Sequence, residues 1–327
     1  MKKLSGVMLA LAMFVGFCPV AQAGEKLMVY TSMKESLIGK LRDAFMKKYP
    51  EVAFDYYSAG AGKLMAKIAA ERQSGKITAD ILWHSEVPDF YQLKKEGVWE
   101  KYVSSEAKTV QSTVKDPDGF FTPARLGTLG IAYNTKKITA PPKGWQDMLD
   151  PRFKDGFAIA NPALSGTAMM SVAMIANTFG WDYIQKLRAN GAKMGAGSGQ
   201  VVDDTASGDF KASLAPDYIA IDKIEKGATM GIVFLQEMLV VPSPIAIFKG
   251  TPNLTAAKKF VDYLLSKEGQ SLVAGEGTLP VRADVATDKK HGLPPADEAV
   301  KRAMKVDYLK VMDEKESIIQ KFQQMMR

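Results

Sequence analysis

The chain has 327 residues, of which 46% are hydrophobic, and 43 Lys and Arg face 36 Asp and Glu for a net charge of +7. This length is enough for two domains, each with its own core. The positive excess is small and spread over many segments, which suits attraction to small anions and argues against nucleic-acid binding.

The first 23 residues have the pattern of a secretory signal peptide. Two lysines precede an apolar run at residues 7–15, and the tripeptide AQA at 21–23 forms an A-x-A cleavage site. The run is too short to span a bilayer. Cleavage after Ala23 would send a chain of net charge +5 to the periplasm, without Cys18, the only cysteine. Such an exported protein must be stabilised by its core and not by disulfides.

Residues 27–50, LMVYTSMKESLIGKLRDAFMKKYP, predict a buried strand, a polar turn and an amphipathic helix. Ser32 and Glu35 have the spacing of a capping box, so we expect the helix to begin there. Such a junction places free backbone N–H groups and the positive end of a helix dipole at the carboxyl edge of a sheet, where an anion can bind. The local pattern also fits an ordinary capped helix.

Strand and helix patterns alternate through the rest of the first third. Strands are expected at 52–57 and 79–83, and helices at 63–74 and 88–96. Each strand ends in small or hydroxylic residues. The alternation predicts a parallel sheet with helices on both faces, and ligands of such sheets collect at the carboxyl ends of the strands.

The second half repeats this order after an extended segment at 121–134, FTPARLGTLGIAYN, which we expect to cross into a second unit. A strand at 157–160 leads through the polar turn NPALSGT into an apolar helix. The further expected elements are a Gly-rich turn at 195–199 before a helix around 201–207, a strand within 211–220 ending at Asp217 and Tyr218, an extended return crossing at 231–248, a patterned helix at 252–266 and charged helices at 295–327.

Most enzyme signatures fail in this sequence. Leu64 follows Gly62-Lys63, so there is no phosphate-binding loop, and neither the dinucleotide fingerprint nor a G-x-S-x-G motif occurs. The two histidines, His84 and His291, are far apart, and His84 is expected to be structural. The remaining hydroxyl, glycine and acid positions at strand ends indicate a binding protein without a cofactor. A secreted hydrolase is an alternative that needs a nucleophile–base pair.

Several segments together resemble the periplasmic solute-binding proteins of bacterial ABC importers. The group that takes ferric iron, phosphonates and sugar phosphates is the most similar. The resemblance rests on the opening strand and helix, ADILWHSEVPDFYQLKKEGVW at 79–99, GIAYN at 130–134, NPALSGTAMM at 161–170, APDYIAID at 215–222 and AAKKFVDYLLSKEGQ at 256–270.

The resemblance implies an α/β protein with the two-lobed periplasmic-binding-protein fold of type II. Its ligand would lie in a cleft between lobes that are joined by two crossing segments and close like a hinge. The implied division is a signal peptide at 1–23, lobe 1 at 24–126 plus 240–290, lobe 2 at 127–239, and C-terminal helices at 291–327.

The resemblance also bears on the ligand. Ferric members hold the metal with a His in the first turn, a Glu after the third strand and two adjacent Tyr. The corresponding places here hold Lys34, Ser85 and Asp217-Tyr218, so only Tyr218 matches. A lysine in the first turn would repel a metal and attract an anion. We therefore expect a phosphorylated or phosphonate anion, with a ferric-ion site of Tyr218, Asp217 and Glu86 as the alternative.

The implied site combines hydroxyls, glycines and a few charges. The expected oxyanion contacts are Thr31, Ser32, Ser58, Gly60, Ser165, Gly166 and Thr167, and Ser85 and Ser198 are further expected ligand-binding residues. Lys34 and Arg125 would add positive charge, while Asp217 and Glu237 would accept hydrogen bonds from an amine or hydroxyls at the other end of the ligand, beside Tyr218. The alternative for the Ser165 to Thr167 turn is a helix cap, and for Asp217 an ion pair.

The resemblance implies partners as well. They are a small anionic ligand and an inner-membrane ABC permease, with a monomeric receptor and no nucleic acid. A receptor that signals to a membrane sensor instead of feeding a transporter would have the same sequence features.

Overall fold

The computed structural model describes residues 25–111, 116–287, 289 and 291–327. The expected signal peptide and its cleavage site lie outside these residues. Within them, no helix has both the length and the apolar character needed to cross a membrane.

Ten strands and eleven α-helices are found in the described part of the chain. The strands are β1 (Glu25–Thr31), β2 (Val52–Ser58), β3 (Ile81–Trp83), β4 (Trp99–Glu100), β5 (Thr122–Asn134), β6 (Phe157–Ala160), β7 (Lys193–Gly195), β8 (Ala212–Pro216), β9 (Met230–Val233) and β10 (Leu239–Phe248). The helices are α1 (Glu35–Lys48), α2 (Ala61–Gln73), α3 (Val87–Lys95), α4 (Gly166–Phe179), α5 (Trp181–Ala189), α6 (Ser198–Ser207), α7 (Asp217–Glu225), α8 (Leu254–Leu265), α9 (Lys267–Gly275), α10 (Ala296–Arg302) and α11 (Tyr308–Met325).

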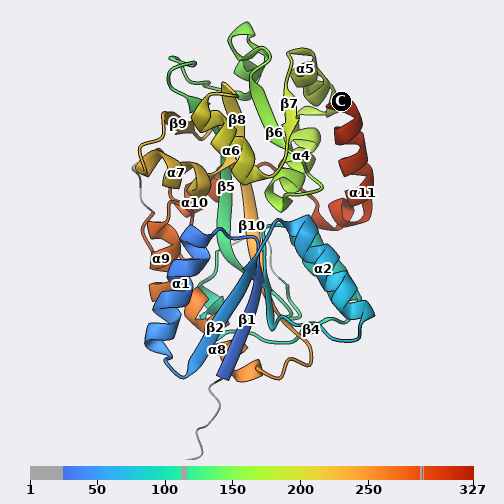
Figure 1. Ribbon diagram of the computed structural model, residues 1–327, viewed down its shortest axis with the longest axis vertical. Coiled ribbons are helices and arrows are strands. Elements are labelled where there is room, and N and C mark those ends of the chain that lie inside the picture. The colour runs from blue at the N-terminus through green and yellow to red at the C-terminus, as the bar shows by residue number, and fades with distance from the viewer. Residues whose placement is uncertain (1–24, 112–115, 288, 290) are drawn as a thin grey trace, which may run out of the picture.

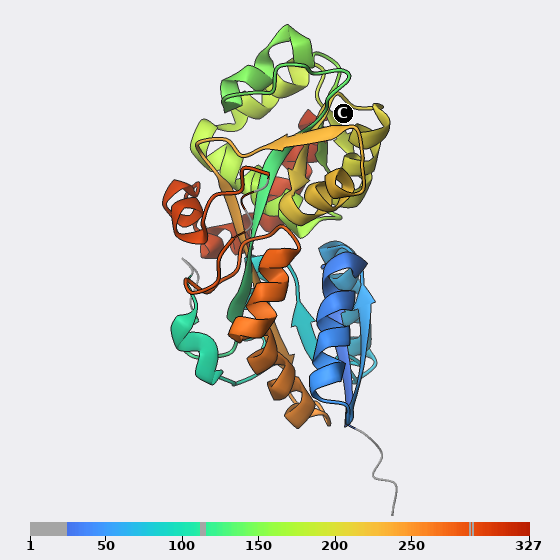
Figure 2. The same cartoon turned by 90° about the vertical axis from the view of Figure 1, so that its left-hand side faces the viewer.

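The strands form one curled sheet in the order β2-β1-β3-β10-β5-β8-β6-β7, with β4 beside β10 and β9 beside β5. Its two ends are parallel, because β1 pairs with β2 and β3, and β6 pairs with β7 and β8. The middle is antiparallel, where β5 pairs with β10. Figures 1 and 2 show β5 and β10 running from one half of the molecule into the other.

Two lobes follow from this arrangement, each with its own apolar core. In lobe 1, which contains β1–β4, α1–α3 and α8–α10, Phe260 of α8 lies edge-on against Phe45 and Phe54, with ring centroids 5.3 and 4.7 Å apart. In lobe 2, which contains β6–β9, α4–α7 and α11, the core is built on α4, whose residues Gly166 to Ile175 are all buried. A helix that is buried on all sides needs an apolar sequence all round, as α4 has.

The C-terminal helix α11 touches both lobes. Ile318, Ile319 and Phe322 belong to the core of lobe 2, while Lys315 reaches Glu86 and Asp89 at the start of α3 in lobe 1, 2.6 Å from the Asp89 carboxylate. The boundaries that divide the sequence into lobes fall within β5 and at the start of β10. They remain a proposal.

Three local predictions are wrong. Helix α1 has Lys34 as its N-cap, without a side-chain cap, so Ser32 and Glu35 form no capping box; the Ser32 hydroxyl instead accepts from the Ser85 N–H. Asp217 and Tyr218 do not end a strand but begin α7, because β8 stops at Pro216. Residues 231–248 are not one extended segment, since β9 and β10 are separate strands on β5.

Candidate functional site

A cavity of about 820 Å³ opens between the two lobes. Five helices begin at its wall, and their N-cap residues, Lys34, Gly60, Ser165, Gly197 and Pro216, all line it. Of these five, only Ser165 caps its helix with a side chain. Uncapped first turns present backbone N–H groups and the positive ends of helix dipoles, so the wall is suited to an anion.

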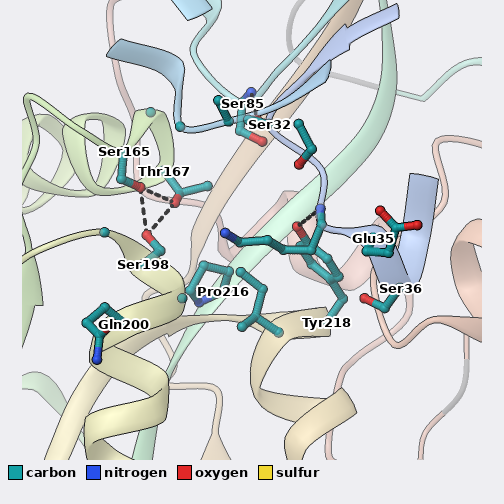
Figure 3. A pocket seen from close by; sticks show the side chains of 18 of the residues that line it. Ser32, Glu35, Ser36, Ser85, Ser165, Thr167, Ser198, Gln200, Pro216 and Tyr218 are labelled. Carbon is teal, nitrogen blue, oxygen red and sulfur yellow. Dashed lines mark hydrogen bonds between the residues drawn. The ribbon is translucent and has the colours of Figure 1, made fainter. Parts of the chain in front are cut away.

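Three hydroxyls of lobe 2 face one another at this wall (Figure 3). Ser165 Oγ lies 2.6 Å from Ser198 Oγ and 3.0 Å from Thr167 Oγ1, and Thr167 and Ser198 are 3.1 Å apart. We call these three residues the hydroxyl triad. Each hydroxyl carries one proton that can rotate, so the triad can turn its donors from one another toward a bound acceptor.

Lobe 1 contributes Ser32, Ser58 and Ser85 to the cavity wall. The Ser58 hydroxyl donates to the Met33 carbonyl at 2.7 Å, and the Ser85 hydroxyl lies 2.8 Å from Ser243 Oγ. These hydroxyls already have partners, which hold them in place. Figure 3 shows Ser32 and Ser85 next to each other, and the Ser85 carbonyl oxygen also lies against Gly166, 3.0 Å from where a Cβ would stand.

Lys34 crosses the cavity from lobe 1 toward lobe 2. Its backbone N–H donates to the Tyr218 hydroxyl at 3.0 Å, which fixes the start of α1. Its ammonium lies beside the first turn of α6, since a Cβ added to Gly199 would stand 3.4 Å from Lys34 Nζ. A cation at a helix N-terminus is unfavourable by itself, and an anion bound between the two would reverse the sign of that interaction.

Arg125 is buried in the cavity wall, with 1% of its surface exposed. Its guanidinium lies 4.8 Å from the centre of the Tyr218 ring. Gly127 makes room for it, because a Cβ there would be 2.1 Å from Arg125 Nη2. The Nε and Nη1 donors have no hydrogen-bond partner in the described part of the chain. Buried charged donors without a partner carry a large desolvation cost, which a bound anion would offset.

Three of the expected contacts do not line the cavity. Thr31 is fully buried, and its hydroxyl donates to the Trp83 carbonyl at 2.8 Å while accepting from Met33 N–H. Asp217 is also fully buried and accepts from both the N–H and hydroxyl of Thr128, from the Thr278 hydroxyl and from Tyr218 N–H. Glu237 is exposed and does not line the cavity, and its carbonyl accepts from Trp145. The geometry therefore gives no support for these three as ligand contacts.

The other expected residues lie together on the wall. They are Ser32, Lys34, Ser58, Gly60, Ser85, Arg125, Ser165, Gly166, Thr167, Ser198 and Tyr218. Their role as ligand contacts remains a proposal.

The residues of the alternative iron site do not converge. Tyr218 lines the cavity, but burial raises the pKa of its phenol, with Arg125 opposing the rise. Asp217 lies behind the wall, and Glu86 pairs with Lys315. Within the described ranges, no three His, Cys, Asp or Glu side chains are grouped to hold a metal ion.

Several charged side chains that line the cavity were not predicted from the sequence. These side chains are Lys63, Lys223 and Lys226 and the carboxylates of Glu35, Asp203 and Asp222. Asp203 pairs with Lys223 at 2.6 Å, and Asp222 pairs with Lys226 at 2.9 Å. The exposed Tyr57 and Leu164 face the cavity from lobe 1 and lobe 2 respectively. Only Lys63 had a usable signal, since it follows the Gly-rich turn that begins α2.

Neither histidine lies at the cavity wall. His84 directly follows β3 and is fully buried against Phe90, and burial lowers its pKa to about 4. His291 pairs with Glu225 at 2.7 Å. The described lining therefore offers no histidine to act as the base of a hydrolase.

The sequence matches a family model described as bacterial extracellular solute-binding protein over residues 77–309. A periplasmic protein of Salmonella typhimurium, provisionally named for 2-aminoethylphosphonate binding, is 27% identical over 261 residues. That match covers 76% of this chain and 75% of the relative.

Two solved structures share the fold. The periplasmic binding protein AfuA of Actinobacillus pleuropneumoniae, with fructose-6-phosphate bound, has a TM-score of 0.78 at 23% identity, over 92% of this chain and 98% of that one. Iron-bound HitA of Pseudomonas aeruginosa has a TM-score of 0.76, also at 23% identity, over 91% and 99%. These similarities confirm the expected two-lobed fold of type II.

Proposed function

The chain belongs to the bacterial extracellular solute-binding proteins, and from this we propose that it is the periplasmic receptor of an ABC importer for a small phosphorylated or phosphonate anion. The ligand enters the cavity between the lobes, the lobes close on it, and the closed receptor delivers it to an inner-membrane permease. No covalent step is involved. The receptor acts as a monomer and needs no cofactor.

The observation that carries this proposal is the buried guanidinium of Arg125. Its Nε and Nη1 donors lack partners in the described structure, although the side chain lines a cavity. A guanidinium forms short, strong bonds to phosphate oxygens and can use two donors at once. Both donors are themselves buried, so a phosphorus oxyanion beside Tyr218 would be attracted by the guanidinium charge and would bond to them once the Arg125 side chain turns toward the cavity.

The rest of the wall supports the same ligand class. Lys34 places a second cation in the cavity, and the hydroxyl triad supplies three rotatable donors. The uncapped first turns of α1, α2 and α6 add backbone N–H groups. A tetrahedral oxyanion with three exposed oxygens can use donors from several directions, as this wall provides from both lobes.

The carboxylates around the cavity favour a ligand whose remaining part carries no ammonium group. Asp203 and Asp222 are paired with lysines, and Glu35 lies beyond Tyr218, away from the hydroxyl triad (Figure 3). Asp217 has four donors already. Among the described lining residues, the carboxylates are thus paired or lie away from the hydroxyl triad, whereas hydroxyls or a carboxylate of the ligand would find Lys63 and Gln200.

Relatives are named for both kinds of phosphorus ligand, since one bears the name of an aminophosphonate and another holds a sugar phosphate. Iron is less well supported. The wall has five cationic side chains against three carboxylates, and a neutral phenol at Tyr218 is a poor iron ligand until it loses its proton.

A thermal-shift screen of the mature protein tests the proposal. The panel contains ethylphosphonate, 2-aminoethylphosphonate, fructose 6-phosphate, 3-phosphoglycerate, inorganic phosphate, citrate and ferric citrate. A ligand at a hundred times its Kd adds about 2.7 kcal/mol of stability, which raises Tm by several degrees. We expect organophosphorus compounds to raise Tm, and ethylphosphonate more than its amino counterpart. A rise with ferric citrate alone would contradict the proposal.

A further inference from the structure

Two glycines of lobe 1 lie against the backbone of lobe 2 at the edge of the cavity. A Cβ added to Gly60 would stand 2.2 Å from the Leu164 carbonyl oxygen, and one added to Gly62 would stand 2.1 Å from the Ala163 carbonyl oxygen. Both distances are far shorter than any tolerated contact, and the obstructing atoms belong to backbone that cannot rotate away. We call this contact the glycine seam.

Within lobe 1 itself, neither position requires glycine. Gly60 has φ −62° and ψ 151°, and Gly62 does not have a left-handed φ, so an L-residue can adopt either conformation. The nearest atoms to each added Cβ all belong to Ala163 and Leu164. The glycines are therefore needed only when the two lobes lie together.

The turn that meets the seam also carries the proposed anion site. Ser165, the N-cap of α4, directly follows Leu164 and belongs to the hydroxyl triad. On the lobe 1 side, Gly60 is the N-cap of α2 and its carbonyl accepts from Leu64 N–H. The distance across the seam thus sets how near the triad comes to Lys34 and Arg125.

We propose that Gly60 and Gly62 are positioning residues, whose missing side chains let lobe 2 close far enough for both lobes to contact one anion. This rests on the proposed function, because it concerns closure over that ligand. Alanine at either position would leave each lobe folded and hold the lobes apart.

The test is Gly62→Ala, with Gly60→Ala as the second variant and Gly275→Ala as the matched control. Gly275 ends α9, and a Cβ there meets nothing within 4 Å. Alanine is the better helix former, so the Tm of ligand-free Gly62→Ala should be unchanged or higher by about 1–3 °C. Its Kd for fructose 6-phosphate and ethylphosphonate, measured by calorimetry, should rise at least ~10-fold, because the closed state becomes rare.

A variant whose stability is kept or raised while its affinity falls is one in which glycine serves positioning and not folding. Unchanged affinity in Gly62→Ala would overturn the inference, and so would a fall in the Tm of the ligand-free variant. If the wild type binds no phosphorus compound of the thermal-shift panel, the proposed function fails and crystal structures decide this inference. A Gly62→Ala crystal with the lobes as near as in the wild type would overturn it, whereas lobes held apart would support it.

Discussion

Replacing Arg125 by methionine tests the site most directly. The variant keeps a long side chain in the wall and removes a guanidinium that is 1% exposed, with two donors lacking partners in the described structure. Each hydrogen bond to a charged group contributes about 1.5–3 kcal/mol, and truncating one partner of a buried charged pair costs about 2–5 kcal/mol. A loss of about 3–5 kcal/mol corresponds to a Kd that is about 100- to 4,000-fold higher.

Folding should be affected far less than binding. In the free protein the guanidinium is desolvated without full compensation, so its loss removes a cost. In the wild type burial raises the pKa of Asp217, and the positive charge of Arg125 opposes this rise. The variant loses this charge, but Asp217 keeps its four hydrogen-bond donors. We therefore expect the Tm of the ligand-free variant to stay close to that of the wild type.

Titration calorimetry with fructose 6-phosphate and ethylphosphonate measures the effect. Arg188→Met is the control, since it removes the same charge from α5, where Arg188 donates to the Arg327 carbonyl. A Kd of Arg125→Met within threefold of the wild-type value would refute the reasoning, because the buried donors would then have no role in binding.

Three further predictions concern the wall and its supports. Ser165→Ala combined with Thr167→Ala should raise Kd at least ~10-fold through the loss of donors to a charged ligand, and calorimetry showing unchanged affinity would remove both residues from the site. Gly127→Ala should weaken binding as Arg125→Met does, because its Cβ would displace Nη2 of the guanidinium; equal Kd values for this variant and the wild type would contradict the packing argument. Burial, with Asp89 nearby, raises the pKa of Glu86 from 4.5 to about 8 in the folded protein. The folded state thus binds more protons than the unfolded state between these values, so this group makes stability fall as pH rises from about 5 to 8. Urea unfolding at pH 5, 6.5 and 8 should show that the free energy of unfolding falls less with pH in Glu86→Gln than in the wild type. Parallel pH profiles for the two proteins would contradict the raised pKa of Glu86.

Much of the fold followed from local patterns. The apolar run and the helical spacing at residues 27–50 predicted β1 and α1, and the same order at 157–179 predicted β6 and α4. These signals are strong because each element buries one face, or all of itself, in a core. The capping box at Ser32 and Glu35 failed because spacing alone does not fix backbone dihedrals. The Ser32 hydroxyl instead accepts from the N–H of Ser85, in the turn that follows the neighbouring strand β3.

The candidate site was partly visible in the sequence. Polar turns after strands predicted that residues such as Ser32, Ser85 and Ser165 would gather at one edge, and the structure places them on one cavity. Thr31 and Asp217 are at similar positions in the sequence pattern. They point into the protein, where neighbouring strands provide their partners. A sequence pattern does not tell these two orientations apart.

The amino-acid sequence by itself determined the strand–turn–helix repeats and the resemblance to solute-binding proteins, and the family match confirms the second of these. These properties depend on residues that are near one another in the chain or on whole-segment patterns. Only the tertiary structure decided which polar groups were already satisfied. It left two donors of Arg125 without a partner among the described residues, and it surrounded the Asp217 carboxylate with four donors. It also brought Gly62 of lobe 1 against Ala163 of lobe 2. Each of these depends on contacts between distant segments, and such contacts are set when the lobes pack together.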